Sequence, residues 1–232
     1  MKVVILQPGF IPWLGFFDQM FRCDTFVIYD DVQYDKHGWR NRNRIKTPAG
    51  HQWLTVPVLT HNLNKPNNNQ IYIDSNSQWK KKHLRSISQN YSKAPYFDRY
   101  YSELENIYND ECDLLLEFNM KLIYFLTEKL NITKKIIFSS ELEIEGTSTQ
   151  RLIDICCYLN ASEYITGDSA KNYINEQMFS ESNIKLTYHN YIHPVYPQLF
   201  GDFISHLSIL DLLFNCGAES LKILSNQAKA VL

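Results

Sequence analysis

Residues 3–20 read VVILQPGFIPWLGFFDQM, and this stretch decides the fold class. Val3–Leu6 is a short apolar run typical of a buried strand, and Gly15–Arg22 is rich in apolar and aromatic residues and is expected to form a helix. A second apolar run, Thr25–Tyr29, follows at once and is expected to form the next strand. The order strand, loop, helix, strand favours a parallel sheet.

The loop inside this stretch is a candidate ligand site. Its position after one strand and before a helix is where many α/β proteins hold ligands. Pro8 and Pro12 stiffen the loop, and its glycines allow close backbone approach. We expect Gln7 to contact a ligand. Trp13 either covers a ring of that ligand or fills the space that a nucleotide would occupy.

Strands and helices continue to alternate along the chain. Further strands are expected at 134–138, 163–166 and 184–188, and helices at 147–159, 170–179 and 206–216. Three longer helical segments lie between the two sets, at 77–89, 96–108 and 112–130. The sequence therefore predicts a single α/β domain over residues 1–232, built on a parallel sheet, with a helical insertion or layer at about 77–130.

Composition and charge exclude several classes of function. The net charge is −2 and the pI about 6.4, so nucleic acid is disfavoured as a partner. No apolar run reaches the roughly 18 residues of a membrane span, and the N-terminus lacks the apolar core of a signal peptide. The five cysteines form no CxxC pair, so neither a zinc site nor a disulfide framework is expected. These features predict a cytoplasmic protein without a metal site of its own; a homo-oligomer is left open.

Basic residues follow the second expected strand, in DDVQYDKHGWRNRNRIK at residues 30–46. They recur at every second position, at Arg40, Arg42, Arg44 and Lys46. On an extended segment these side chains share one face, and arginine suits phosphate or carboxylate. Arg40, Arg42 and Lys46 are therefore phosphate-binding candidates, with Tyr34 and Trp39 beside them. We call this row of basic residues the basic comb. The acids Asp30, Asp31 and Asp35 are expected to pair with the basic comb or to hold Mg²⁺ through water. The alternative is a solvated hairpin with surface ion pairs.

Two later loops also carry candidate residues. In ITGDSAKNYI, residues 165–174, Ser169 at a helix start and Lys171 would bind an anion, unless the segment is only a helix cap. In HPVYPQLFGDF, residues 193–203, two prolines stiffen a loop in which His193, Tyr196 and Gln198 would line a pocket. His193 is a candidate general base. The alternative is a rigid surface crossover.

Long motifs in the chain resemble the WbqC-like family, whose members are associated with gene clusters for surface polysaccharide, including O-antigen. The stretches that carry the resemblance are QPGFIPWLGFFD, DDVQYDKHGWRNRNRIKTPAG, WLTVPV and HPVYPQLFGDFISHLSILDLLFNCG. They cover nearly the whole chain. The family implies a biological setting and not a reaction.

A second resemblance concerns mechanism. VQYDK at 32–36 and TGDSAKNY at 166–173 are similar, in order, to segments of pantothenate synthetase. This implies a nucleotidyltransferase-like, Rossmann-like fold, with Gln33 on a substrate and Lys171 at a phosphate. That enzyme's two loop histidines would fall on Trp13 and Phe16 here, so their role is not carried over.

The two resemblances together imply a function. We expect an enzyme that transfers an acyl or aminoacyl group to a nucleotide-linked amino sugar, with ATP and Mg²⁺ as candidate cofactors for activating the acid. Two alternatives stay open: a non-catalytic module that binds a nucleotide or nucleotide-sugar, and a nucleotidyltransferase that makes the activated sugar.

Overall fold

Five parallel strands form the main sheet, in the order β7-β2-β1-β8-β9. The computed structural model describes residues 1–61 and 63–225, so the predicted domain of residues 1–232 extends outside the described part. The strands are β1 (Lys2–Leu6), β2 (Thr25–Ile28), β7 (Lys135–Phe138), β8 (Glu163–Thr166) and β9 (Lys185–Tyr188).

The chain enters this sheet at its centre. β1 pairs with β2 on one side and with β8 on the other, with Val4 opposite both Phe26 and Ile165. β7 then extends the sheet beyond β2, and β9 extends it beyond β8. This is a Rossmann-like order, in which the chain changes sides between β1 and β8. The predicted fold class, α/β with a Rossmann-like parallel sheet and a helical layer, is confirmed.

Each face of the sheet packs into its own hydrophobic core. Alternate residues of a strand point to opposite faces, so Val4 and Phe26 join one core and Val3 and Val27 the other. Helices α1 (Leu14–Arg22) and α4 (Leu115–Lys129) contribute to the first core. Helices α5 (Ser148–Tyr158) and α6 (Glu176–Glu181) contribute to the second.

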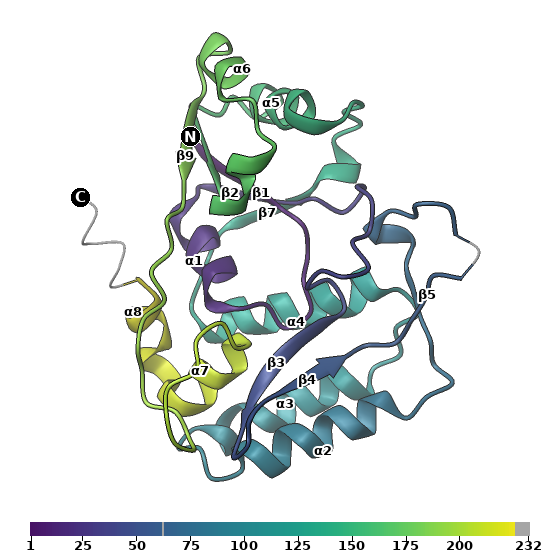
Figure 1. Cartoon of the computed structure of the whole chain (residues 1–232), viewed down its shortest axis with the longest axis vertical. Helices are drawn as coiled ribbons and strands as arrows, with labels where there is room; N and C mark the ends of the chain where they lie inside the picture. The colour runs from purple at the N-terminus through teal and green to yellow at the C-terminus, as the bar shows by residue number, and fades with distance from the viewer. Residues whose placement is uncertain (62, 226–232) are drawn as a thin grey trace.

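A helical layer lies below the sheet in Figure 1 and surrounds a β-hairpin. Its helices are α2 (Trp79–Tyr91), α3 (Phe97–Asn109), α4, α7 (Ile209–Cys216) and α8 (Ser220–Ser225). The hairpin pairs β3 (Arg42–Thr47) with β4 (Gly50–Thr55), and a second, shorter one pairs β5 (Val58–Leu59) with β6 (Tyr72–Ile73). Within the described residues, four 3₁₀ turns complete the order: η1 (Asn68–Gln70), η2 (Ser139–Glu141), η3 (Asp168–Asn172) and η4 (Gly217–Glu219).

Residues 189–208, which we call the strap, connect the parallel sheet to the helical layer. The strap leaves β9 and runs down one side of the molecule to α7 (Figure 1). Helix α7 begins later than the expected residue 206, because His206 has a positive φ of 58° and the Ser208 side chain caps the helix by accepting from Leu210 N at 3.3 Å. In the described part of the chain, no helix is both long and apolar enough to cross a membrane.

The expected helix at 170–179 is wrong. The segment instead forms η3 and, after a break, α6. Asn175 begins α6, because its side chain accepts a hydrogen bond from Gln177 N at 3.1 Å. Ser169 and Lys171 therefore lie on a 3₁₀ turn and not at the start of an α-helix.

Candidate functional site

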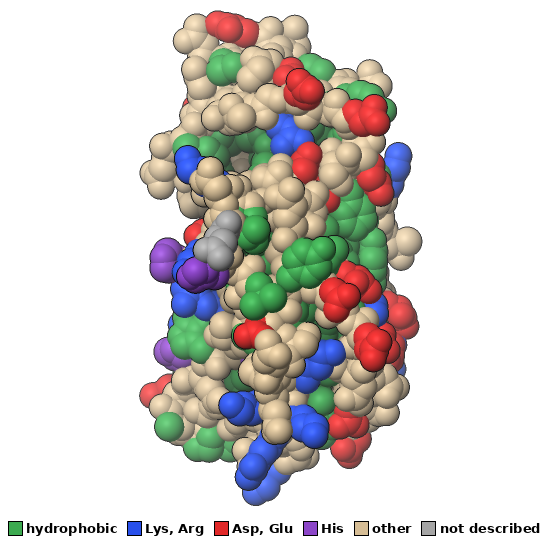
Figure 2. Space-filling model, turned by 90° about the vertical axis from the view of Figure 1, so that its right-hand side faces the viewer, with side chains coloured by type: hydrophobic (Ala, Val, Ile, Leu, Met, Phe, Trp, Pro, Cys, Tyr) green, Lys and Arg blue, Asp and Glu red, His purple; other side chains and the backbone are tan. Residues whose placement is uncertain are grey.

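Polar residues follow four neighbouring strands at the carboxyl edge of the sheet. Gln7 and Ser139 directly follow β1 and β7, and Asp30 and Asp168 lie two residues after β2 and β8. Because the strands are parallel, these ends meet at one edge, where the change of sides between β1 and β8 opens a crevice. In Figure 2 the molecule is hollowed in its upper part, with hydrophobic and charged side chains around the hollow. This edge is the candidate site.

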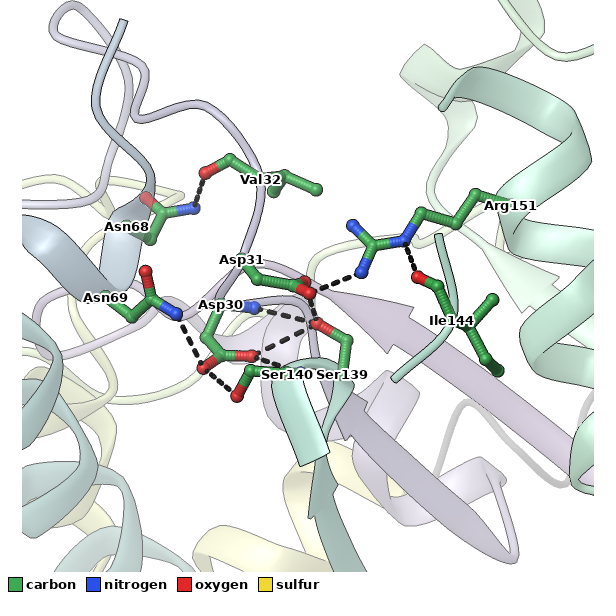
Figure 3. Close-up of polar contacts among 9 residues, drawn as sticks. All are labelled: Asp30, Asp31, Val32, Asn68, Asn69, Ser139, Ser140, Ile144 and Arg151. Carbon is green, nitrogen blue, oxygen red and sulfur yellow. Dashed lines mark hydrogen bonds and ion pairs between the residues drawn. The ribbon is translucent and has the colours of Figure 1, made fainter. Parts of the chain in front are cut away.

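Asp30 is buried and joins three segments of this edge (Figure 3). One carboxylate oxygen accepts from Ser139 Oγ and from Ser140 N, both at 3.1 Å. The other accepts from Ser140 Oγ at 2.7 Å and from Asn69 Nδ2 at 3.5 Å. Buried carboxylates need such donors. Asp30 therefore holds the ends of β2 and β7 and the η1 turn together.

Asp31 pairs with Arg151 of α5 across 120 residues (Figure 3). Its other oxygen accepts from Ser139 Oγ at 2.5 Å, while Arg151 Nε donates to Ile144 O at 3.0 Å. Burial opposes the charge of Arg151, but the hydrogen bond and charge of Asp31 outweigh it and raise the pKa of the guanidinium. The expectation that Asp30 and Asp31 pair with the basic comb is wrong, because serines and Arg151 hold them.

Arg40 brings a cation to the same edge without an acidic partner. Its Nη1 donates to Gln7 O at 3.2 Å, and its buried Nε makes no hydrogen bond. Within the described residues, no carboxylate oxygen lies within 4 Å of its guanidinium. Burial lowers the pKa of Arg40, and the negative charge of Asp35 opposes this shift. A desolvated cation with unused donors is suited to an anionic ligand.

Other predicted substrate residues lie around Arg40. The Tyr34 side chain is buried, its hydroxyl has no partner, and burial raises its pKa to about 12. Gln7 accepts from Asn68 Nδ2 at 3.3 Å, and Gln33 is exposed beside the η1 turn, where it pairs with Asn67. The structure therefore brings Gln7, Gln33, Tyr34 and Arg40 to one edge.

The three basic residues on β3 do not share one environment. Arg42 and Arg44 lie against the exposed indoles of Trp39 and Trp53. Lys46 departs from the expected pattern, because only 1% of it is exposed. Its ammonium donates to Gln198 Oε1 at 3.0 Å and to Asp202 O at 2.6 Å. The expectation of four basic side chains on one open face is therefore wrong for Lys46.

Gln198 and Tyr196 belong to this buried network and not to an open pocket. Gln198 Nε2 donates to Asp211 Oδ2 at 2.7 Å, and Tyr91 Oη donates to Asp211 Oδ1 at 2.8 Å. Tyr196 is buried beside them. Burial raises the pKa of Asp211 to about 6, against the hydrogen bonds that its carboxylate accepts. The network fixes the strap to the hairpin and to α7.

His193 and Trp13 meet in an aromatic cluster under the strap. The Trp13 indole stacks on His206 at 5.0 Å and on His193 at 6.5 Å between ring centroids, and the edge of Tyr191 meets it at 5.2 Å. His193 Nδ1 lies 2.9 Å from Pro194 O, and its buried Nε2 has no partner. Burial lowers the pKa of His193. The imidazole is therefore held neutral, with Nδ1 as the donor and Nε2 as an unused acceptor.

Lys171 and Ser169 lie on the other side of the crevice, in η3. Lys171 Nζ is 3.3 Å from Asp168 Oδ1 and 4.9 Å from the centre of the Tyr188 ring. The Ser169 side chain is exposed. Within residues 1–61 and 63–225, no three His, Cys, Asp or Glu side chains are grouped so that they could hold a metal ion.

Several residues of this region were missed. Arg151 and Ser139 lie far from Asp31 in sequence, and no local motif marks either of them. A hydrogen-bonded cluster around the buried Asp18 was also missed: His189 Nε2 lies 2.5 Å from Asp18 Oδ2, which also accepts from Arg22 Nε at 2.6 Å. Asp18 appears in the sequence as one acid on an aromatic helix, and only the folded strap brings His189 to it.

A separate cavity of about 570 Å³ lies at the start of α2, away from the carboxyl edge. Its lining includes Trp79, Lys80 and Cys112. In the part of the chain that the structure describes, no buried polar side chain without a partner lines it. We assign no function to it.

Together, these observations define an α/β protein with a Rossmann-like parallel sheet and a cluster of polar residues at the carboxyl edge of that sheet. The model of the WbqC-like protein family matches residues 7–223, and the chain belongs to this family. It is similar to the uncharacterized protein Rv1507c of Mycobacterium tuberculosis (strain ATCC 25618 / H37Rv), with 41% identity over 221 residues, which are 94% of this chain and 95% of that protein. No solved structure gives a significant match.

Proposed function

We propose that this protein transfers an acyl or aminoacyl group to the amine of a nucleotide-linked sugar, and that the carboxyl edge of the sheet binds the phosphates of that substrate. Arg40 carries the proposal. Its guanidinium is desolvated, has an unused Nε–H and lacks a carboxylate partner within the described residues. Charge-assisted hydrogen bonds to phosphate would satisfy these donors. The surface-polysaccharide setting of the family is where nucleotide-linked amino sugars are consumed.

The transfer step needs a base and groups that stabilise charge. The amine nitrogen attacks the acyl carbonyl carbon, the bond to the donor's leaving group breaks, and the amine loses a proton. His193 is the proposed base, because its neutral ring has an unused acceptor at Nε2. Lys171 is proposed to neutralise charge that develops on the oxygens.

ATP is the proposed activating cosubstrate, with Mg²⁺ as its companion ion. The residues of the edge fit a polyphosphate through Arg40, whereas Asp30 and Asp31 already accept hydrogen bonds from protein donors. A donor that is already activated, such as an acyl thioester, would place the same demands on Arg40 and His193. The chemistry at the amine is the same in both cases.

Two observations favour a second candidate function, a non-catalytic module that binds a nucleotide-sugar. The carboxylates of Asp30 and Asp31 both have protein partners, and Trp13 and Phe16 occupy the positions that the resemblance assigns to catalytic histidines. A module of this kind needs Arg40 but no base.

The two candidates are separated by product formation and by binding. The protein is incubated with a panel of nucleotide-linked amino sugars and acyl-CoA donors, or with acids, ATP and Mg²⁺, and amide products are sought by mass spectrometry. Calorimetry on the same sugars is expected to show a loss of affinity of about 10- to 100-fold for Arg40→Gln, since hydrogen bonds to charged groups contribute about 1.5–3 kcal/mol. The matched control is Arg85→Gln, which changes an exposed arginine on α2.

Each result has a definite consequence. Binding without any product supports the module. Absence of pyrophosphate release across the acid panel, with sugar binding intact, removes ATP from the proposal but retains a pre-activated donor. Equal affinities of wild-type protein and Arg40→Gln for every nucleotide-sugar would remove the carboxyl edge as the phosphate site.

A further inference from the structure

Two exposed tryptophans lie side by side at the β3–β4 hairpin, Trp53 on β4 and Trp39 three residues before β3 begins. Trp39 and Trp53 are each 41% exposed, and their ring centroids are 5.1 Å apart with planes tilted by 39°. Burial of an indole is strongly favourable, so adjacent exposed tryptophans leave a large apolar surface in water. Exposed apolar patches with a polar rim often mark binding surfaces. We call Trp39, Trp53, Arg42 and Arg44 the Trp–Arg platform.

Both arginines of the platform lie over its rings. The guanidinium carbon of Arg44 is 5.4 Å from the centre of Trp39 and 5.6 Å from that of Trp53, and that of Arg42 is 4.9 Å from Trp53. Such cation–π contacts favour this arrangement of the rings and the guanidinium groups by about 0.5–1 kcal/mol each at exposed sites.

Backbone carbonyls, and not carboxylates, hold these arginines. Arg42 donates to Gly38 O at 3.3 Å and to His37 O at 2.6 Å, and Arg44 donates to His206 O at 3.1 Å. Among the described residues, no carboxylate oxygen lies within 4 Å of either guanidinium. The platform therefore combines two aromatic rings with positive charge that no acid neutralises.

A ligand that uses both features has a planar ring and an anionic group. A heterocyclic base stacks on an indole through its face, and a phosphate pairs with guanidinium donors. A neutral sugar would use the rings but not the charge. A nucleotide therefore fits the platform better than a neutral carbohydrate does.

The platform is also hydrogen-bonded, through the backbone of Trp39, to the loop that contains Gln7. Trp39 O accepts from Phe10 N at 3.2 Å, and a Cβ built on Gly9 would lie 3.1 Å from the same oxygen. Gly9 thus permits the close approach of the two segments. Because Trp39 precedes Arg40 directly in the chain, the platform begins one residue from the proposed phosphate site.

We propose that the Trp–Arg platform binds the base of a nucleotide by stacking on Trp39 and Trp53. This inference rests on the proposed function in one respect: the nucleotide is taken to be the carrier of the sugar or the ATP cosubstrate whose phosphates Arg40 holds. It adds a ring-binding subsite outside the carboxyl edge.

The test uses purified full-length protein and four probes: UDP, ADP, inorganic pyrophosphate and methyl N-acetylglucosaminide. Tryptophan fluorescence quenching and calorimetry are followed for wild-type protein, Trp39→Leu and Trp53→Leu. Tyr72→Leu is the control, because Tyr72 is an exposed aromatic residue on β6, outside the platform. Loss of one stacking contact is expected to weaken UDP or ADP by about 10- to 100-fold and to leave pyrophosphate unchanged. The control should bind both nucleotides as the wild type does.

Several outcomes would overturn the proposal. They are unchanged nucleotide affinity in both folded tryptophan variants, no UDP or ADP binding by the wild type, and quenching by the glycoside alone. Trp39→Leu and Trp53→Leu are made separately, and Arg44→Lys is added, so that unfolding of one variant still leaves a test. Arg40→Gln separates this proposal from the proposed function: pyrophosphate affinity is expected to depend on Arg40 but not on the rings of Trp39 and Trp53. If the tryptophan variants lose affinity for the nucleotides and Arg40→Gln does not, the platform is supported and Arg40 is excluded as the phosphate site.

Discussion

The indole of Trp13 lies directly over Gly15 at the start of α1. A Cβ built on Gly15 would be 2.4 Å from two carbons of the Trp13 ring, and Tyr191 and His206 pack against that ring. Glycine at position 15 is therefore required by packing and not by an unusual backbone angle. Trp13 therefore packs the loop between β1 and α1 against the strap.

Gly15→Ala is expected to destabilise the protein by about 1–3 kcal/mol, the usual cost of overpacking. The measurement is the free energy of unfolding in urea. Gly167→Ala is the matched control, because a Cβ at Gly167 meets nothing within 4 Å. A loss at Gly15 no larger than that at Gly167 would show that the Trp13 ring moves aside without cost.

The Asp31–Arg151 pair is expected to couple β2 to α5 energetically. Only 8% of the Arg151 side chain and 21% of the Asp31 side chain are exposed, so water weakens this pair less than a surface pair. A double-mutant cycle with Asp31→Asn and Arg151→Met should give a coupling of about 1–3 kcal/mol in urea unfolding.

The same cycle on Glu219 and Lys222 supplies the comparison. Those side chains are 62% and 70% exposed, and Lys222 Nζ lies 3.2 Å from Glu219 Oε2. A coupling below about 1 kcal/mol is therefore expected. Equal couplings for the two pairs would mean that Asp31–Arg151 behaves as a surface pair.

Much of the fold could be predicted from local sequence patterns. The apolar runs of β1 and β2 and the intervening helix are short-range signals, and they were sufficient to predict a parallel sheet. Pairings between distant segments have no such signal. Alternation predicted that Lys46 shares the face of Arg42 and Arg44, but the strap then folds over its ammonium and supplies Gln198 and Asp202 O.

The candidate site was predicted in part for the same reason. Gln7 directly follows the first predicted strand and Tyr34 lies soon after the second, so topology brings both to one edge. Arg40 lies farther along the chain and reaches that edge through its hydrogen bond to Gln7 O. Arg151 and Trp53 reach their partners through pairings that only the three-dimensional structure specifies.

Asp211 is expected to make the stability of the fold depend on pH. Burial raises its pKa from 3.8 to about 6, so the folded state binds a proton more tightly than the unfolded state does. Protonated Asp211 therefore stabilises the fold fully below about pH 4. This contribution to the free energy of unfolding, about 3 kcal/mol in all, is lost as the pH rises to about 6. Unfolding free energies of wild type and Asp211→Asn are compared between pH 4 and pH 7. The variant should lack this decline, and parallel curves would exclude Asp211 as its source.

His193→Gln is expected to separate catalysis from binding if the imidazole is the proposed base. Removal of a general base lowers turnover by about 10²–10⁴-fold. The affinity for the nucleotide-sugar should stay within about twofold, because Arg40 and not His193 binds the phosphates. Burial lowers the pKa of His193 below 6.5, so the neutral base form persists through neutral pH. Turnover of the wild type should therefore hold as the pH falls to 6.5 and decline only below it. A variant that loses affinity and turnover together, with a lowered melting temperature, would instead show that His193 only packs in the aromatic cluster around Trp13 and is not the base.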